Sequence, residues 1–461
     1  MRLATLLALG IALTWTDSTA HAFDDQEIPI GVASVDITPS YPVRLAGYGS
    51  RRTESEGIEQ RLKAQALALG SDAEGPSVLV VIDNCFISAP ITEEVAARLQ
   101  AKAGLKRERF VVCATHTHCA PSLSGVASLI FATEIPPEHQ EHIDRYTREL
   151  TDQIEAAALK ALADRRPGRL AWTEGRVGFA ANRRVLKEGR WVGFGVTPGG
   201  PVDHALPMLR ATDADGKLRA VLVNYACHCT TLGGKFNKIC GDWAGYAREA
   251  IERDHPGATA LIVIGCGADA NPEPREDLRF APQHGEAVAR EVNRLLQEPL
   301  RPLPGISLAR FRRIELPFDT LPTRAQWEER AQQPGAVGFH ARAQLARLDR
   351  GEKLPTTLTY PIQVWCFGDD LAMVFLGGEV VVDYALRLKK ECDAKRLWIN
   401  AYSNDVPCYI ASRRILQEGG YEADGSMLYY DRPTRLAPEV EDRIVAAVHD
   451  LLPESFCTPE H

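Results

Sequence analysis

Continuous apolar runs of strand length alternate with helical patterns along most of the chain, and this alternation restricts the fold more than any other feature. Residues 78–83 and 110–115 have the pattern of buried strands. Apolar side chains recur at helical spacing elsewhere, most clearly over residues 136–166. No internal repeat or low-complexity linker divides the pattern. We therefore expect an α/β (mixed α+β) fold, with one large domain over residues 23–453, mixed β-sheets flanked by helices, and a C-terminal tail over residues 454–461.

One predicted strand leads directly into a pair of histidines. Residues 110–115 are followed by His116 and His118, which point the same way in an extended segment. In α/β folds, functional groups gather where strands end. Imidazole is the commonest metal ligand. A His-x-His pair alone is also compatible with a polar surface turn, so its meaning depends on the other strand ends.

Three further strand ends carry polar side chains. His228 follows an apolar run, Glu379 follows the predicted hairpin of residues 358–376, and Tyr409 lies in the loop after a strand at residues 397–400. Taken singly, His228 also fits a histidine packed between thiols, and Glu379 also fits a helix N-terminal charge. Taken together, two imidazoles, a carboxylate and a phenol oxygen suit Zn²⁺.

The N-terminus predicts export. Arg2 precedes an apolar stretch at residues 3–15, and the Ala-His-Ala of residues 20–22 matches a signal-peptidase site. We expect a signal peptide over residues 1–22, cleaved after Ala22, and a secreted or periplasmic protein. No later stretch is a transmembrane candidate. The net charge of −8 gives no reason to expect a nucleic-acid partner.

Eleven cysteines are a large number, and an odd one, for a chain of this length. At least one thiol must stay free or pair between chains. Several cysteines lie at the predicted strand ends, so we expect buried thiols and one or a few disulfides at most. The candidate disulfide partners are Cys240 and either Cys229 or Cys227, and Cys266 and Cys119 are the thiols whose state matters most.

Seven motifs, in their order along the chain, resemble the neutral (non-lysosomal) ceramidase family, specifically its N-terminal catalytic domain. They are GVASVDITP (31–39), LAGYG (45–49), THTH (115–118), NRR (182–184), GDWAGYA (241–247), GADANP (267–272) and GE (378–379). The resemblance extends over most of the chain after the signal peptide. It implies a zinc-dependent amidohydrolase, because this family hydrolyses the N-acyl amide of ceramide to sphingosine and a fatty acid.

The resemblance also implies roles for individual residues. The zinc-ligand positions fall on His116, His228, Glu379 and Tyr409. The other active-site positions fall on His118, Arg183 and Tyr421. The implied mechanism is attack of a zinc-bound water on an amide or ester carbonyl of a small-molecule or lipid N-acyl substrate. Arg183 would stabilise the oxyanion and His118 would pass a proton to the leaving group, while Tyr421 would position the substrate. For Asp242 we expect a helix N-cap.

The chain departs from the family pattern at two places. Gly265, with Cys266 beside it, stands where ceramidases carry a serine. The chain also ends near the end of the catalytic domain, so we expect the family's C-terminal immunoglobulin-like domain to be absent. Two alternatives follow from the residues. One is a metal-independent cysteine hydrolase that uses Cys266; the other is a catalytically inactive binding protein on the same fold.

Overall fold

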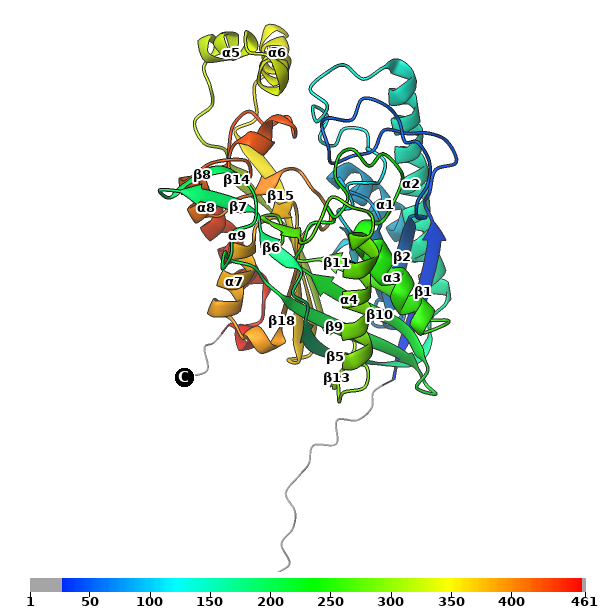
Figure 1. The fold of residues 1–461 in the computed structure, drawn as a ribbon. Coiled ribbons are helices and arrows are strands. Elements are labelled where there is room, and N and C mark those ends of the chain that lie inside the picture. Colours follow the sequence, from blue (N-terminus) through cyan, green and yellow to red (C-terminus); the bar gives the residue numbers. More distant parts are fainter. Residues whose placement is uncertain (1–26, 458–461) are drawn as a thin grey trace, which may run out of the picture.

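A nine-stranded mixed sheet forms the centre of the protein, as seen in a computed structural model that describes residues 27–457 (Figure 1). The strand order is β11-β10-β9-β5-β1-β2-β3-β4, with β13 paired to β5. The strands are β1 (Ile28–Asp36), β2 (Lys63–Leu69), β3 (Ser77–Ile82), β4 (Phe110–Ala114), β5 (Arg166–Arg176), β9 (Ala205–Asp213), β10 (Leu218–Tyr225), β11 (Thr259–Ile264) and β13 (Arg301–Leu303). The two apolar runs predicted as buried strands are β3 and β4, and all their residues are buried.

A second sheet of four strands packs against one face of the large sheet. It contains β14 (Leu308–Pro317), β15 (Thr357–Phe367), β16 (Leu371–Leu376) and β18 (Leu397–Asn400), in that order. Leu79 and Val111 of the large sheet join Trp365 and Met373 of the small sheet in one buried cluster. The predicted hairpin is confirmed, because β15 and β16 pair in antiparallel fashion.

Helices cover the outer faces of both sheets. On the large sheet lie α1 (Ala89–Ala103), α2 (Pro137–Ala163), α3 (Asp242–Asp254) and α4 (Phe280–Leu295); on the small sheet lie α7 (Val382–Glu391) and α9 (Val440–Leu451). Alternate strand residues face opposite layers: Val78 and Val80 pack with the helical residues Tyr146 and Ile154, whereas Leu79 packs toward the small sheet. This layered arrangement confirms the predicted α/β class.

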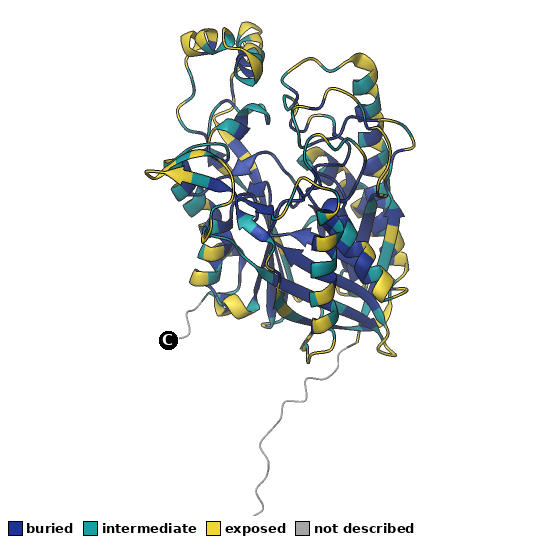
Figure 2. Ribbon diagram, in the orientation of Figure 1, coloured by how far each residue is buried: buried dark blue, intermediate teal, exposed yellow. Residues whose placement is uncertain are grey.

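Helices α5 (Arg324–Ala331) and α6 (Gly335–Asp349) form a separate hairpin at the top of Figure 1. Much of their surface is exposed (Figure 2). Trp327, Ala341 and Leu354 form their small core. An ion pair between Arg347 and Asp431 ties the hairpin to a loop of the main body.

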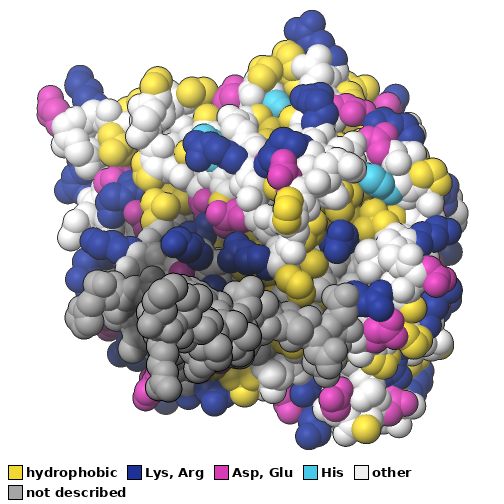
Figure 3. All heavy atoms as spheres, turned by 90° about the horizontal axis from the view of Figure 1, so that it is seen from below, with side chains coloured by type: hydrophobic (Ala, Val, Ile, Leu, Met, Phe, Trp, Pro, Cys, Tyr) yellow, Lys and Arg dark blue, Asp and Glu magenta, His cyan; other side chains and the backbone are white. Residues whose placement is uncertain are grey.

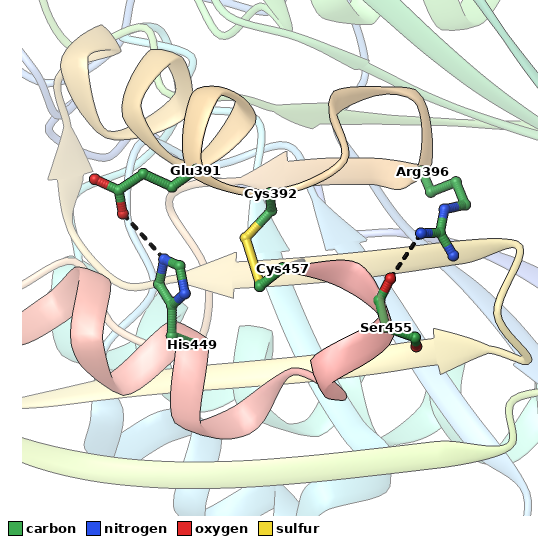
Figure 4. The surroundings of a disulfide bond; sticks show 6 residues. All are labelled: Glu391, Cys392, Arg396, His449, Ser455 and Cys457. Carbon is green, nitrogen blue, oxygen red and sulfur yellow. Dashed lines mark hydrogen bonds and ion pairs between the residues drawn. A yellow bond between two sulfur atoms is a disulfide. The ribbon is translucent and has the colours of Figure 1, made fainter. Parts of the chain in front are cut away.

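The disulfide joins Cys392 to Cys457, and the predicted pairing of Cys240 with Cys229 or Cys227 is wrong (Figure 4). Those three thiols are buried and free, and the Cys240 sulfur lies 3.4 Å from the backbone nitrogen of Asp242. The other free cysteines of residues 27–457 are also buried, which confirms the expectation of buried thiols.

The disulfide also holds residues 454–457, which were expected to be part of a tail, against the body of the protein. Residues Glu454–Phe456 form the short helix η4, and Phe456 is fully buried. Arg396 donates a hydrogen bond to the backbone oxygen of Ser455, again holding this segment to the body. The packed fold therefore continues past residue 453 to Cys457, and residues 458–461 lie outside the described residues.

The face seen from below carries both signs of charge. Figure 3 shows Lys and Arg side chains lying among Asp and Glu side chains on the part of this face that the described residues form. Such a surface is mixed in charge and offers no continuous basic track there. Among the helices of residues 27–457, none has the length and apolar character needed to span a bilayer.

Candidate metal centre and its cavity

Short segments after three strands bring two histidines and a glutamate together. His116 follows β4, His228 follows β10, and Glu379 begins β17 (Glu379–Val380) after β16. A parallel bridge between Thr117 and Cys229 holds the first two segments side by side. The φ of His116 is 57°, so its segment is not the extended one that was predicted. The imidazoles of His116 and His118 nevertheless meet, with their Nε2 atoms 3.1 Å apart.

Three potential ligand atoms converge in a buried position. Glu379 Oε2 lies 3.0 Å from His116 Nε2 and 3.2 Å from His228 Nε2. All three residues can place a ligand atom within 4.8 Å of the others. The two histidines are fully buried and Glu379 is 2% exposed. The structure therefore unites three of the four residues that the sequence pointed to as metal ligands.

Each of the two imidazole rings is oriented by a hydrogen bond at its Nδ1 atom, on the side away from the candidate metal centre. His116 Nδ1 lies 2.8 Å from the carbonyl oxygen of Cys85, and His228 Nδ1 lies 2.9 Å from that of Gly267. A carbonyl oxygen only accepts, so each Nδ1 carries the proton and each Nε2 presents a lone pair to the centre. Glu379 Oε2 is buried without a hydrogen-bond partner. Buried lone pairs that face one another in this way fit a bound cation.

Tyr409 is the fourth predicted ligand, and β-pairing places it beside Glu379. Strand β19 (Tyr409–Ile410) is parallel to β17, and Tyr409 is the register partner of Glu379. The Tyr409 hydroxyl lies 3.2 Å from His228 Nε2. The sequence placed Tyr409 in a loop, and in the structure it is only 3% exposed. The same hydroxyl accepts a hydrogen bond from Arg183 over 3.0 Å.

Arg183 lies between two short strand pairs that the sequence did not predict. It follows β6 (Ala180–Asn182), which pairs with β12 (Ala270–Pro272), and precedes the hairpin of β7 (Arg184–Lys187) and β8 (Arg190–Phe194). Its Nε donates to the fully buried Glu422 over 2.9 Å. Arg184 donates to the other oxygen of that carboxylate. Glu422 thus compensates the charge of Arg183 and fixes its orientation.

A cavity of about 270 Å³ opens beside these residues. His118, Arg183, Tyr409 and Tyr421 line it, as do several loop residues. His118 is 8% exposed, and its buried Nδ1 has no hydrogen-bond partner. Gly47 packs directly on the His118 ring, because a Cβ at that glycine would come within 2.3 Å of it. The sequence-predicted catalytic residues therefore meet at one cavity next to the candidate metal centre.

Burial and neighbouring charge shift several pKa values at this site. Burial, together with the positive charge of Arg183, lowers the pKa of His228 to about 4. Burial and the neighbouring His116 hold the pKa of His118 well below its usual value. Burial acts to raise the pKa of Glu379, but His116 and His228 outweigh it and hold that pKa well below its usual value. These shifts favour the unprotonated forms of His228 and Glu379, which metal ligation requires.

Two further expectations change. Asp242 is the first residue of α3 and not its N-cap, which is Gly241; the Asp242 carboxylate accepts hydrogen bonds from the backbone of Thr231, Leu232 and Trp243. It therefore fixes the loop that follows His228.

Cys266, the nucleophile of the alternative cysteine hydrolase, does not reach the cavity. It is 1% exposed, is not among the residues that line the cavity, and has a thiol pKa raised by burial.

Several site residues carried no signal in the sequence. Tyr430 donates a hydrogen bond to Glu379 Oε1 from a turn after a short 3₁₀ helix. Tyr402 stacks on the His116 ring with centroids 4.3 Å apart. Glu422 and Arg275 lie in loops without periodicity. Recognising them requires the tertiary structure, since nothing in their local sequence distinguishes them from ordinary loop residues.

The sequence pattern described as "Neutral/alkaline non-lysosomal ceramidase, N-terminal" matches residues 29–271. Neutral ceramidase from Pseudomonas aeruginosa is 29% identical over 258 residues, which are 54% of this chain and 37% of that protein. Neutral ceramidase B from Dictyostelium discoideum is 26% identical over 247 residues, which are 50% of this chain and 32% of that protein. The matched stretch thus spans well under half the length of either relative.

A solved structure extends the comparison to the rest of the chain. The crystal structure of neutral ceramidase from Pseudomonas aeruginosa aligns with a TM-score of 0.69 over 93% of this chain and 74% of that chain, at 20% identity. The two proteins share a fold over most of this chain. Because the family pattern covers more than half of the chain, the protein belongs to the neutral/alkaline non-lysosomal ceramidase family.

Proposed function

We propose that the protein is a zinc-dependent amidohydrolase that cleaves the N-acyl amide of a ceramide-like lipid, or a related ester. The observation that carries this proposal is the buried convergence of His116 Nε2, His228 Nε2 and Glu379 Oε2. The names of the two curated relatives described above, both neutral ceramidases, support an amide as the substrate.

The donor set fits zinc. Two neutral imidazoles and one carboxylate form a common catalytic zinc shell, and the Tyr409 oxygen is a candidate fourth ligand. A bound zinc ion supplies Lewis acidity toward the carbonyl and lowers the pKa of water to about 7. Tyr430 holds the second oxygen of Glu379, which leaves Oε2 for the ion.

The chain's own residues would orient the substrate and move the protons. The cavity-facing guanidinium of Arg183 would donate to the carbonyl oxygen as negative charge develops there. His118, which lines the cavity, would carry a proton to the leaving nitrogen. Water adds its oxygen to the carbonyl carbon and the C–N bond breaks, so the products are a carboxylate and an amine. Tyr421 would position the substrate, since its ring packs edge-on against Tyr409.

We further propose that the protein acts outside the cytoplasm. The support is the signal-peptide pattern of residues 1–22 and the disulfide between Cys392 and Cys457, a bond that persists in oxidising compartments. Fractionation of cells that produce the full chain tests this. A cytoplasmic, uncleaved product would contradict it.

The hydrolase proposal is tested by turnover with matched substrates. Purified protein is treated with a chelator, dialysed, and assayed with and without added Zn²⁺ on a short-chain ceramide, an N-acyl ethanolamine and the corresponding O-acyl ester. We expect amide hydrolysis that zinc restores. Turnover that persists after complete metal removal would overturn the proposal.

A further inference from the structure

The cavity wall beside the candidate metal centre contains two arginines and, among the described residues that line it, no carboxylate. The basic residues that line it are His118, Arg183 and Arg275. No Asp or Glu is among the described residues that line it. Arg183 is neutralised by the buried Glu422 behind it, whereas no fully buried carboxylate forms an ion pair with Arg275 among the described residues. Its carboxylate neighbour within 4.0 Å is Glu276, at 3.7 Å, and that side chain is 72% exposed to solvent.

Arg275 is held in place rather than left free on the surface. Its Nε donates to the backbone oxygen of Thr230 over 3.0 Å, and one terminal nitrogen lies 3.4 Å from the Tyr48 hydroxyl. Only 23% of its side chain is exposed. The next residue, Glu276, donates its backbone N–H to Thr231 over 2.7 Å. The remaining guanidinium donors therefore have a fixed direction, which is the condition for recognising a planar anion.

A chain of hydrogen bonds connects Arg275 to the proposed reaction centre. Arg183 donates to Asn271 Oδ1 over 3.3 Å, and the Thr230 hydroxyl donates to the same oxygen over 3.2 Å. Thr230 in turn accepts from Arg275 through its backbone oxygen. Both arginines thus belong to one connected wall of the same cavity, with Arg183 at the metal end.

We propose that Arg275 is an anion subsite, and that the preferred substrate carries a negatively charged group near the scissile N-acyl bond. This inference rests on the proposed amide hydrolysis and narrows its substrate class. A cavity of about 270 Å³ is slightly smaller than most ligand sites and suits a compact anionic head group, with the acyl chain extending out of the cavity. The charge of Arg275, whose ion-pair partner Glu276 is mostly exposed, also favours entry of an anionic substrate over a neutral one. The anion is a carboxylate, as in an N-acyl amino acid, or a phosphate on a short head group.

The test compares matched acyl compounds in four proteins. N-octanoylglycine, N-octanoylethanolamine and its O-phosphate are assayed with the wild type, R275Q, R275K and the control R279Q. Arg279 lies nearby but outside the residues that line the cavity. We expect the anionic amides to exceed the neutral amide by at least about tenfold in kcat/KM in the wild type. R275Q should abolish this preference through KM, R275K should keep part of it, and R279Q should keep all of it. The more active of the two anionic compounds identifies the source of the charge.

A binding measurement tests the anion subsite at Arg275 independently of turnover. Calorimetric titration with N-octanoylglycine should show affinity for the wild type and a loss of about tenfold or more in R275Q, whether or not the amide is cleaved. Equal affinity in both proteins, or a wild-type preference for the neutral amide, would overturn the anion subsite. Absence of zinc-dependent turnover of every amide would instead overturn the proposed function and leave the binding result to decide the subsite.

Discussion

Glu379 and Tyr409 are register partners in the two-residue parallel pair of β17 and β19, although thirty positions of chain separate them. This pairing places a carboxylate and a phenol oxygen on the same side of the candidate metal centre. The Tyr409 hydroxyl also accepts from Arg183, so it links the ligand set to the residue proposed to bind the carbonyl.

Removal of the Tyr409 hydroxyl should slow turnover. Y409F loses a candidate ligand and also leaves a terminal nitrogen of Arg183 without its acceptor. We expect kcat/KM to fall by about tenfold to a hundredfold. Steady-state kinetics with Y41F as the control checks this, because Tyr41 donates its hydroxyl to Glu149 away from the cavity. Equal activity of Y409F and Y41F would remove Tyr409 from the reaction.

Neutralising Glu422 should destabilise the fold. The carboxylate is fully buried and serves both Arg183 and Arg184, so E422Q leaves buried positive charge without compensation. We expect a loss of about 3–5 kcal/mol in the free energy of unfolding. E418Q is the matched control, since Glu418 also pairs with Arg184 but is 11% exposed. Urea unfolding that ranks E418Q as the more damaging change would contradict this reading of the pair.

The Cys266 thiol should be dispensable. It is buried away from the cavity, and burial raises its pKa, so the reactive thiolate is disfavoured. We expect C266A to retain wild-type kcat/KM and the native protein to resist a polar thiol reagent. Loss of turnover in C266A, with H116A still active, would favour the cysteine-hydrolase alternative.

Asp405 should make stability depend on pH. Burial raises its pKa to about 6, while its carboxylate accepts a hydrogen bond from the backbone of Ala89. The folded state then keeps a proton that the unfolded chain releases near pH 3.8. Asp405 therefore makes its full contribution to the free energy of unfolding below about pH 4, and this contribution is lost as the pH rises to about 6.

D405N keeps the acceptor and removes this titration. Relative to D405N, the wild type should lose about 1–3 kcal/mol of unfolding free energy between pH 4 and pH 7. Denaturant unfolding of both proteins across this range measures the difference. A constant difference would show that Asp405 has an ordinary pKa.

The strand ends were predictable because a buried strand is a continuous apolar run, and its last residues are readable from the sequence. This is why His116, His228 and Glu379 were found together with β4, β10 and β16. Tyr409 was placed in the loop after β18, because its own strand β19 is only two residues long. Arg183 was identified through the family resemblance, because β6, the strand before it, is only three residues long. Such strands are too short to show a period of two.

The supporting residues depend on long-range contacts that no local pattern records. Glu422 serves an arginine more than two hundred positions earlier, and Tyr430 reaches Glu379 from a turn. The disulfide was misplaced for the same reason. Cys240 lies near Cys119 through a backbone contact, whereas Cys392 and Cys457 meet only because η4 folds back onto the end of α7.

The zinc content of purified H116A and H118Q, measured beside the wild type, tests the central claim most directly. His116 is a proposed ligand, whereas His118 lies beside it at the cavity wall and is proposed only to move a proton. Elemental analysis should find about one zinc per chain in the wild type and in H118Q, and far less in H116A, with turnover lost in both variants. A wild-type protein that turns over N-acyl substrate without bound metal, or an H116A protein that keeps its zinc, would contradict the account.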